Sequence, residues 1–148
     1  MLQEDLQKLF HRDLNKLKTE IELYPNEQAI WVTGGQITNS AGNLCLHIIG
    51  NLNTYIGAQL GGSGYVRQRD LEFSLKDVPR AELIKKIEDT IKVIDTTVST
   101  LTDQQLDMEY PIMVFENKTS TAYFLIHLAG HLTYHLGQIN YHRRLLAI

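Results

Sequence analysis

Apolar residues recur at three- and four-residue steps along most of this chain, which is the spacing of amphipathic helices. The clearest stripes predict helices at residues 2–23 and 79–101, where leucine and isoleucine alternate with charged side chains. Two further helices are predicted at about residues 40–61 and 121–146, in segments that carry almost no charge. Because no long run alternates in the manner of a strand, the chain is predicted to be all-α.

The predicted helix ends carry residues that cap or break helices. These are Asn39 or Ser40, Gly61 with Gly62, Pro79, and Thr119 or Ser120. Residues 26–39 are expected to be irregular, with one helical turn near Trp31, and residues 65–73 form a loop of strand-like composition. A further loop is expected at residues 102–118. We therefore predict a four-helix bundle whose long connections do not require simple up-down-up-down order.

Composition narrows the function classes. The length of 148 residues suits one domain with one core, so residues 1–148 are predicted to form a single domain. The net charge is −3 and basic runs are absent, which argues against nucleic-acid binding. One cysteine forbids an internal disulfide, and the first residues do not resemble a secretory signal. Polar residues such as Asn51 within the uncharged segment argue against a membrane span, so we expect a cytoplasmic protein.

Histidines are concentrated where charge is absent. Four of the six lie in the two uncharged segments: His47, His127, His131 and His135. After Glu116 the chain contains no carboxylate. Two helices that are neutral on every face are expected to be the more buried pair. Imidazoles gathered on such a pair suggest a metal site.

Spacing limits which histidines can share one ion. His131 and His135 are four residues apart, so they lie on one helix face about 6 Å apart along the axis. His127 lies about 12 Å from His135 along that axis, so the useful pair is either 127/131 or 131/135. His47 is the natural third ligand, whereas Cys45 points to another side of its helix. The alternative is that these are surface or core histidines that happen to have helical spacing.

Other polar residues are weaker candidates. Five could contact the ligands or a substrate, although core hydrogen bonding explains each of them equally well: Asn51, Tyr55, His127, Tyr134 and Gln138. Arg67, Arg69 and Glu72 are predicted to form an ion-pair cluster that holds their loop. His11 is expected to be solvated. His142 lies near the C-terminus of its helix, where the dipole favours cations, and is expected to be structural.

Three motifs carry a resemblance to a known family: residues 39–52, with Asn-Ser-Ala-Gly-Asn-Leu before His47 and Gly-Asn-Leu after it, residues 65–73, and residues 127–139. The sequence resembles the DinB/YfiT-like family, in particular its DUF1572-type branch. The resemblance implies a four-helix bundle with up-down-down-up order and a divalent metal held by His47, His131 and His135. It also implies a homodimer, and an activity that is either hydrolysis or transfer with a small thiol such as bacillithiol, mycothiol or glutathione.

Three imidazoles would suit zinc or nickel, with copper and iron as alternatives, and would leave a Lewis-acidic ion with an open position. In H-E-x-x-H hydrolases a glutamate follows the first histidine, but here Leu132 stands there. The base would have to be His127, a loop carboxylate such as Glu72, or water activated by the ion, which favours thiol transfer over peptidase chemistry. We expect a metal-dependent hydrolase or thiol-dependent transferase acting on a small molecule. The alternative is a non-catalytic metal-binding or dimeric helical protein.

Overall fold

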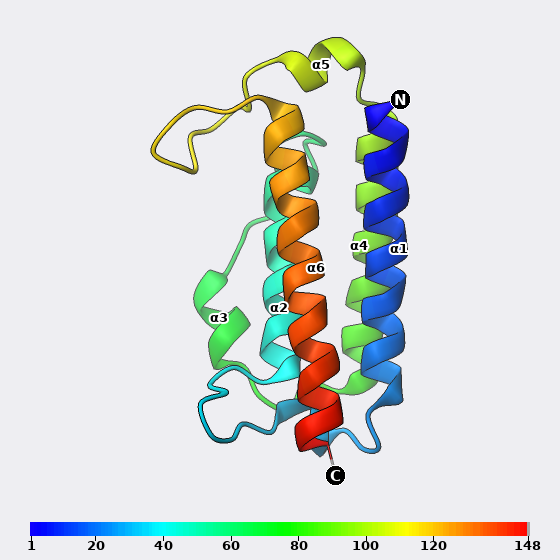
Figure 1. The fold of residues 1–148 in the computed structure, drawn as a ribbon, viewed down its shortest axis with the longest axis vertical. Helices are drawn as coiled ribbons and strands as arrows, with labels where there is room; N and C mark the ends of the chain where they lie inside the picture. Colours follow the sequence, from blue (N-terminus) through cyan, green and yellow to red (C-terminus); the bar gives the residue numbers. More distant parts are fainter. Residues whose placement is uncertain (148) are drawn as a thin grey trace.

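Four long helices lie side by side along the molecule (Figure 1). The structure is a computed structural model and describes residues 1–147, which are all-helical apart from loops and two isolated β-bridges. In the view of Figure 1, α1 and α6 run downwards, whereas α2 and α4 run upwards. The elements in order are α1 (Leu2–Leu23), the 3₁₀ turn η1 (Gln28–Trp31), α2 (Ala41–Leu52), the π-helical segment η2 (Asn53–Ala58), α3 (Arg69–Ser74), α4 (Arg80–Ser99), α5 (Asp103–Asp107) and α6 (Thr121–Leu146).

The predicted caps hold the helices that matter most for the site. The Ser40 hydroxyl accepts a hydrogen bond from the backbone N–H of Asn43 at 3.2 Å and begins α2. Ser120 accepts one from the backbone N–H of Tyr123 at 3.1 Å and begins α6. The boundaries of α1, α4 and α6 and the turn at Trp31 agree with the sequence-based expectation to within two residues.

The second helix does not keep its pitch to Gly61, as the sequence had suggested. It is α-helical to Leu52 and then widens into η2, where the backbone N–H of Gln59 reaches the carbonyl of Thr54. The side-chain amide of Asn53 donates to the Ile49 carbonyl at 2.9 Å. This side-chain donor competes for a carbonyl of the α-helical ladder at the place where the pitch changes.

Two expected loops contain short helices. The expected loop at residues 65–73 is a loop only in its first half, because α3 begins at Arg69. Asp70 and Glu72 lie in the first turn of α3, where the helix dipole favours acids. The loop at residues 102–118 contains α5, which begins with a capping box between Thr102 and Gln105. That four-residue signature, Thr102 followed three residues later by Gln105, is visible in the sequence.

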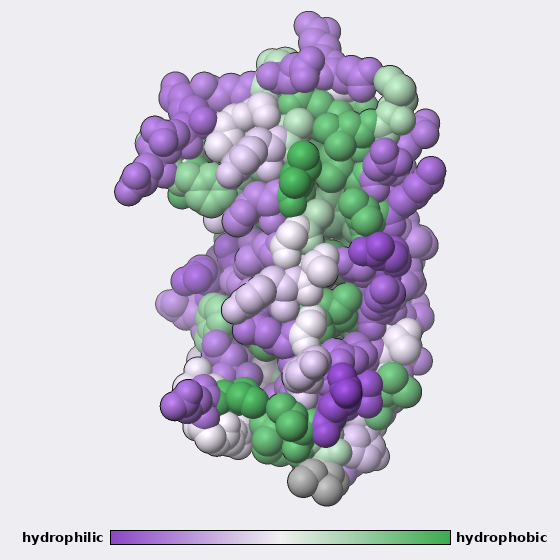
Figure 2. All heavy atoms as spheres, in the orientation of Figure 1, coloured by the Kyte–Doolittle hydropathy of each residue, from purple (hydrophilic) through white to green (hydrophobic). Residues whose placement is uncertain are grey.

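The core lies where α1, α2, α4 and α6 meet. Every residue of α2 is buried, as its uncharged composition predicted. The same expectation was wrong for α6, which has one buried face and one exposed face. Figure 2 shows pale and green side chains following α6 between purple borders. The large exposed side chains on this helix are Tyr123, Ile126, Tyr134, Tyr141 and Leu145.

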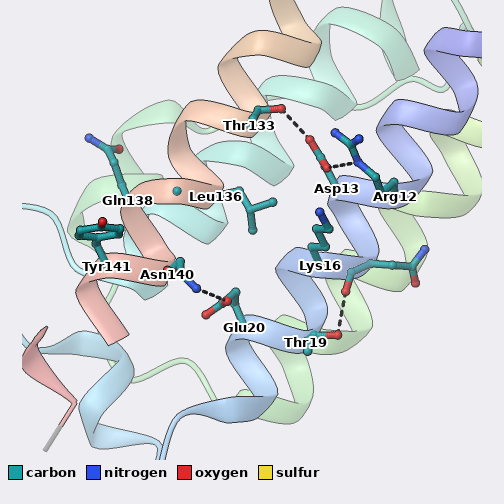
Figure 3. Close-up of a pocket in the computed structure, with 12 residues that line it drawn as sticks. Arg12, Asp13, Lys16, Thr19, Glu20, Thr133, Leu136, Gln138, Asn140 and Tyr141 are labelled. Atoms are coloured by element: carbon teal, nitrogen blue, oxygen red, sulfur yellow. Dashed lines mark hydrogen bonds and ion pairs between the residues drawn. The ribbon is translucent and has the colours of Figure 1, made fainter. Parts of the chain in front are cut away.

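The side of α6 that faces α1 has polar contacts. A groove of about 900 Å³ lies between these helices. Figure 3 shows side-chain hydrogen bonds that bridge it at two levels. Thr133 donates to the buried carboxylate of Asp13 at 2.6 Å, and Asn140 donates to Glu20 at 2.7 Å. Within residues 1–147, no helix combines the length and apolar composition that crossing a membrane requires.

Candidate metal centre

Three histidines meet between α2 and α6. The Nε2 atom of His131 lies 3.2 Å from Nε2 of His47 and 3.1 Å from Nε2 of His135. One ligand atom from each residue lies within 4.8 Å of the others. His47 is buried, and His131 and His135 are half-buried. The structure therefore brings together the ligand set that the resemblance implied, and it selects the 131/135 pair on α6.

The geometry of this tripod fits a transition-metal ion. Zinc–imidazole bonds of about 2.0–2.1 Å in a tetrahedron place neighbouring nitrogens about 3.3–3.4 Å apart. The two Nε2 separations of 3.2 Å and 3.1 Å are close to that value. On α2, Asn51 lies one turn beyond His47, and its buried Oδ1 has no hydrogen-bond partner among the described residues. The three side chains could hold one divalent ion, with imidazole donors that suit zinc, nickel, copper or iron.

The outer ring nitrogens hold the tripod in the correct tautomer. Nδ1 of His47 lies 2.9 Å from Oε1 of Glu72, and Nδ1 of His135 lies 2.7 Å from Oε1 of Gln138. Both oxygens only accept, so each Nδ1 atom carries a proton. In the neutral ring this tautomer leaves the lone pair on Nε2, which lies toward His131, as a metal ligand requires.

Glu72 is itself fixed by Arg67. The Arg67 guanidinium donates to Oε2 at 2.8 Å and to Oε1 at 3.0 Å, in a two-pronged ion pair. Burial, with Glu72 only 6% exposed, would raise the pKa of this carboxyl, but the hydrogen bonds from His47 and Arg67 outweigh burial and lower it. Glu72 is thus a charged acceptor for His47, and the loop cluster predicted from the sequence has this additional role. Arg69 is not part of an ion pair in the described chain, and instead lies over the Phe73 ring.

A glycine and an asparagine on α2 place Glu72. A methyl group at Gly50 would overlap the Glu72 carboxylate, so only glycine leaves room for it one turn from His47. The side-chain amide of Asn43 donates to the backbone carbonyls of Glu72 at 3.0 Å and Leu75 at 2.8 Å. These contacts anchor α3 against α2. Neither role follows from helical spacing alone, because both depend on where a separate loop lies.

The environment favours the neutral form of the two histidines on α6. Burial, together with the neighbouring His135 and His47, lowers the pKa of His131 to about 4. Burial also lowers the pKa of His135, and this effect exceeds the opposing effect of its bond to Gln138. His131 is therefore unprotonated near neutral pH, which is the form that binds metals.

The other candidates are spread around the site. Gln138 contacts the His135 side chain directly. Tyr134 is 66% exposed, and its ring centre lies 5.4 Å from that of His135. His127 is exposed, and its ring centre is 6.3 Å from that of His131, outside the tripod. The half-buried ring of Tyr55 lies against Phe124, with the Arg67 guanidinium 5.8 Å from its centre.

Three residues that were not predicted to bind the metal also have defined positions in the structure. Cys45 is buried, and burial raises the pKa of its thiol to about 12, so it stays protonated and outside the tripod. His142 is structural, as predicted, but it is 2% exposed and bonded by both ring nitrogens, rather than serving as a surface cation. His11 is exposed, as predicted, and pairs with Asp95 at 3.0 Å.

Comparison with known proteins now gives the family. A family model described as "Protein of unknown function (DUF1572)" matches residues 3–147. The chain belongs to the DUF1572 family. No curated protein and no solved structure matches it. The matched region includes the three histidines of the tripod and the segment that contains Glu72. The family's description states no activity.

Proposed function

We propose that this DUF1572 protein is a metal-dependent transferase that uses a low-molecular-weight thiol, with His47, His131 and His135 as the metal ligands. The observation that carries the proposal is the convergence of three Nε2 atoms, two of them 3.2 Å and 3.1 Å from the third. We also propose that the fold is a DinB/YfiT-like four-helix bundle. The directions of the four long helices in Figure 1 support that assignment.

The donor set defines the chemistry. When bound, a divalent ion held by three neutral imidazoles keeps its full charge and acts as a Lewis acid on a water or thiol at its open position. Zinc or nickel are the expected ions, with copper and iron as alternatives. The charge of Arg67, near His47, is offset by Glu72, so the protein adds little net charge beside the ligands.

The surroundings favour a thiol over water as the nucleophile. Hydrolases of the H-E-x-x-H type place a free carboxylate beside the ion as a general base. Here both oxygens of Glu72 are occupied by His47 and Arg67, and its pKa is lowered, so it is a poor proton acceptor. A thiol loses its proton far more readily than water, so it needs a weaker base. Hydrolysis is the second candidate activity.

His127 is the residue best placed to take that proton. It is exposed, lies one turn from His131, and has no side-chain hydrogen bond among the described residues. In the transfer step the thiol sulfur forms a bond to carbon of the acceptor, and the leaving group departs with its electron pair. The thiol proton passes to the imidazole of His127 and then to solvent.

The test uses metal-free protein reloaded with Zn²⁺ or Ni²⁺. Monochlorobimane is supplied with bacillithiol, mycothiol or glutathione, and p-nitrophenyl acetate reports hydrolysis. We expect metal-dependent conjugation with one thiol, and loss of that activity in His131→Ala. Hydrolysis without thiol would favour the second candidate. Metal binding without either reaction would favour a non-catalytic metal-binding protein, and no metal binding would overturn the proposal.

The homodimer and the cytoplasmic location expected from the sequence stay predictions. The exposed, uncharged face of α6 offers apolar surface that a second copy could cover. Sedimentation analysis of the purified protein would check the dimer.

A further inference from the structure

A cavity of about 500 Å³ lies directly beside the tripod. Its walls are residues 36–39 of the loop before α2, Leu44 in the first part of α2, and the face of α6 that includes His135. His135 therefore belongs both to the tripod and to the cavity wall. A molecule held here lies next to the proposed metal ligands, and the volume is in the range of small-molecule sites.

The loop that forms one wall is held at both of its ends. Its tip is a tight turn in which Gly34 and Ile37 exchange backbone hydrogen bonds of 2.9 Å and 3.3 Å, and Gly35 has a φ of 55°. At its start, Nε2 of His142 donates to the Val32 carbonyl at 2.7 Å. At its end, Ser40 caps α2. Contacts within the protein therefore hold this wall in place without a bound ligand.

The lining combines apolar and polar side chains, and none of its residues carries a formal charge. The only imidazoles there are His135 and His142, and His142 uses both ring nitrogens in the core. The polar and aromatic side chains along the wall are Gln36, Thr38, Asn39, Gln138, Tyr134 and Tyr141. No side chain of the lining carries the opposite charge that would offset the lost hydration of a charged ligand, and the Arg144 guanidinium is engaged over the Tyr141 ring, 5.1 Å from its centre. The groove in Figure 3 shares Gln138 and Tyr141 with this cavity, but its α1 side carries the charged residues Arg12, Lys16 and Glu20.

Gln138 links the cavity to the tripod. Its Oε1 is taken by Nδ1 of His135 at 2.7 Å, so its side-chain N–H groups remain as donors. Tyr134 and Tyr141 lie on the same wall and are 66% and 62% exposed. Aromatic rings with hydroxyl groups bind ligands that combine an apolar face with hydrogen-bonding groups.

We propose that this cavity is the substrate subsite of the metal centre, and that it takes an uncharged moiety rich in hydroxyl or amide groups, whose apolar face rests on Tyr134 and Tyr141. The inference builds on the proposed function, because it takes the tripod as the reacting centre. It specifies the substrate class for that centre: a neutral carbohydrate-like or peptide-amide group.

The experiment measures binding to metal-free protein by the backbone and side-chain amide signals in nitrogen–proton correlation spectra. Methyl glucoside and N-acetylglycine-N-methylamide are the neutral probes, and their comparison separates hydroxyl from amide recognition. Glucuronate and glucosamine are charged probes of similar size to the glucoside. Tyr134→Ala removes a cavity wall, and Tyr123→Ala, on the same helix and 59% exposed, is the matched control.

We expect at least one neutral probe to shift the signals of residues 36–39 and Gln138, with both charged probes binding more weakly. Tyr134→Ala is expected to weaken binding about tenfold, which corresponds to one aromatic contact, while Tyr123→Ala leaves it unchanged. Absence of these shifts, equal binding of the charged probes, or an unaltered affinity in Tyr134→Ala overturns the subsite. A separate Zn²⁺ titration shows whether the metal proposal itself fails, so the two failures are distinguishable.

Discussion

The same helix, α6, forms two seams of opposite character. Toward α1, the Asp13 carboxylate receives hydrogen bonds from Thr133 and from Arg12, at 2.6 Å and 2.8 Å. Toward α2, three imidazoles direct Nε2 atoms at one another, with lone pairs that repel unless a proton or cation lies between them. The α1 seam satisfies its polar groups internally, and the α2 seam gathers acceptors.

This difference indicates that the α1 seam contributes to the stability of the fold and that the α2 seam is suited to binding a cation. A polar network whose donors and acceptors match stabilises a fold, and nothing further is needed to complete it. A buried cluster of acceptors costs stability unless a ligand binds it. The polar residues at the α1 seam therefore maintain the position of α6, and the α2 seam is where a cation is expected.

The largest expected effect is at the centre of the tripod. His131→Ala leaves two imidazoles, so zinc affinity should fall by more than the roughly 10–100-fold typical of losing an outer contact. His127→Ala removes an imidazole from the same helix, one turn away and outside the tripod, and should leave affinity unchanged. Calorimetric titration of both variants measures this. Equal losses would mean that the ligand set is wrongly assigned.

An intermediate effect is expected at Glu72. Glu72→Gln weakens the acceptor that fixes His47, and we expect zinc affinity to fall about 10–100-fold. Gly50→Ala should produce a similar loss, because its methyl group displaces the same carboxylate. Glu109→Gln, at an exposed ion pair, is the control. Unaltered affinity in both Glu72→Gln and Gly50→Ala would show that the contact between Glu72 and His47 does not affect zinc binding.

The smallest effect on metal binding is expected at the α1 seam. Asp13→Asn should lower the free energy of unfolding by about 1–3 kcal/mol, with zinc affinity unchanged. Asp89→Asn, at an exposed pair with Lys85, should lower the free energy of unfolding by less than Asp13→Asn does. Denaturant unfolding measures both values. A change in zinc affinity in Asp13→Asn would show that the α1 seam and the metal site are coupled.

The pH dependence of that stability has a definite sign. Burial would raise the pKa of Asp13, but the hydrogen bonds from Arg12 and Thr133 lower it below 3.8. The contribution of Asp13 is thus fully present above that unfolded value and is lost as the pH falls through the folded pKa. Acid unfolding of Asp13→Asn should therefore show a smaller loss of stability than wild type over that range.

The sequence predicted much of the fold because its helices carry strong local signals. The stripes of α1 and α4 and the caps Ser40 and Ser120 depend on neighbours within a few residues. The exposed face of α6 was missed because neutrality does not imply burial when tyrosine and glycine supply the uncharged positions.

The site was predictable in part for the same reason. The spacing of His131 and His135 is local, but only the resemblance separated this pair from 127/131. The role of Glu72 depends on α3 folding back onto α2, 25 residues after His47. The sequence contains the two charges of the Glu72–Arg67 pair, but not the direction in which either side chain points.

The most direct test of the central claim is X-ray absorption spectroscopy on the protein loaded with one equivalent of Zn²⁺. We expect three imidazole nitrogens at about 2.0–2.1 Å in wild type and two in His131→Ala, with His127→Ala like wild type. Fewer than three imidazoles in wild type, a sulfur ligand, or a spectrum that is the same in His131→Ala would contradict it.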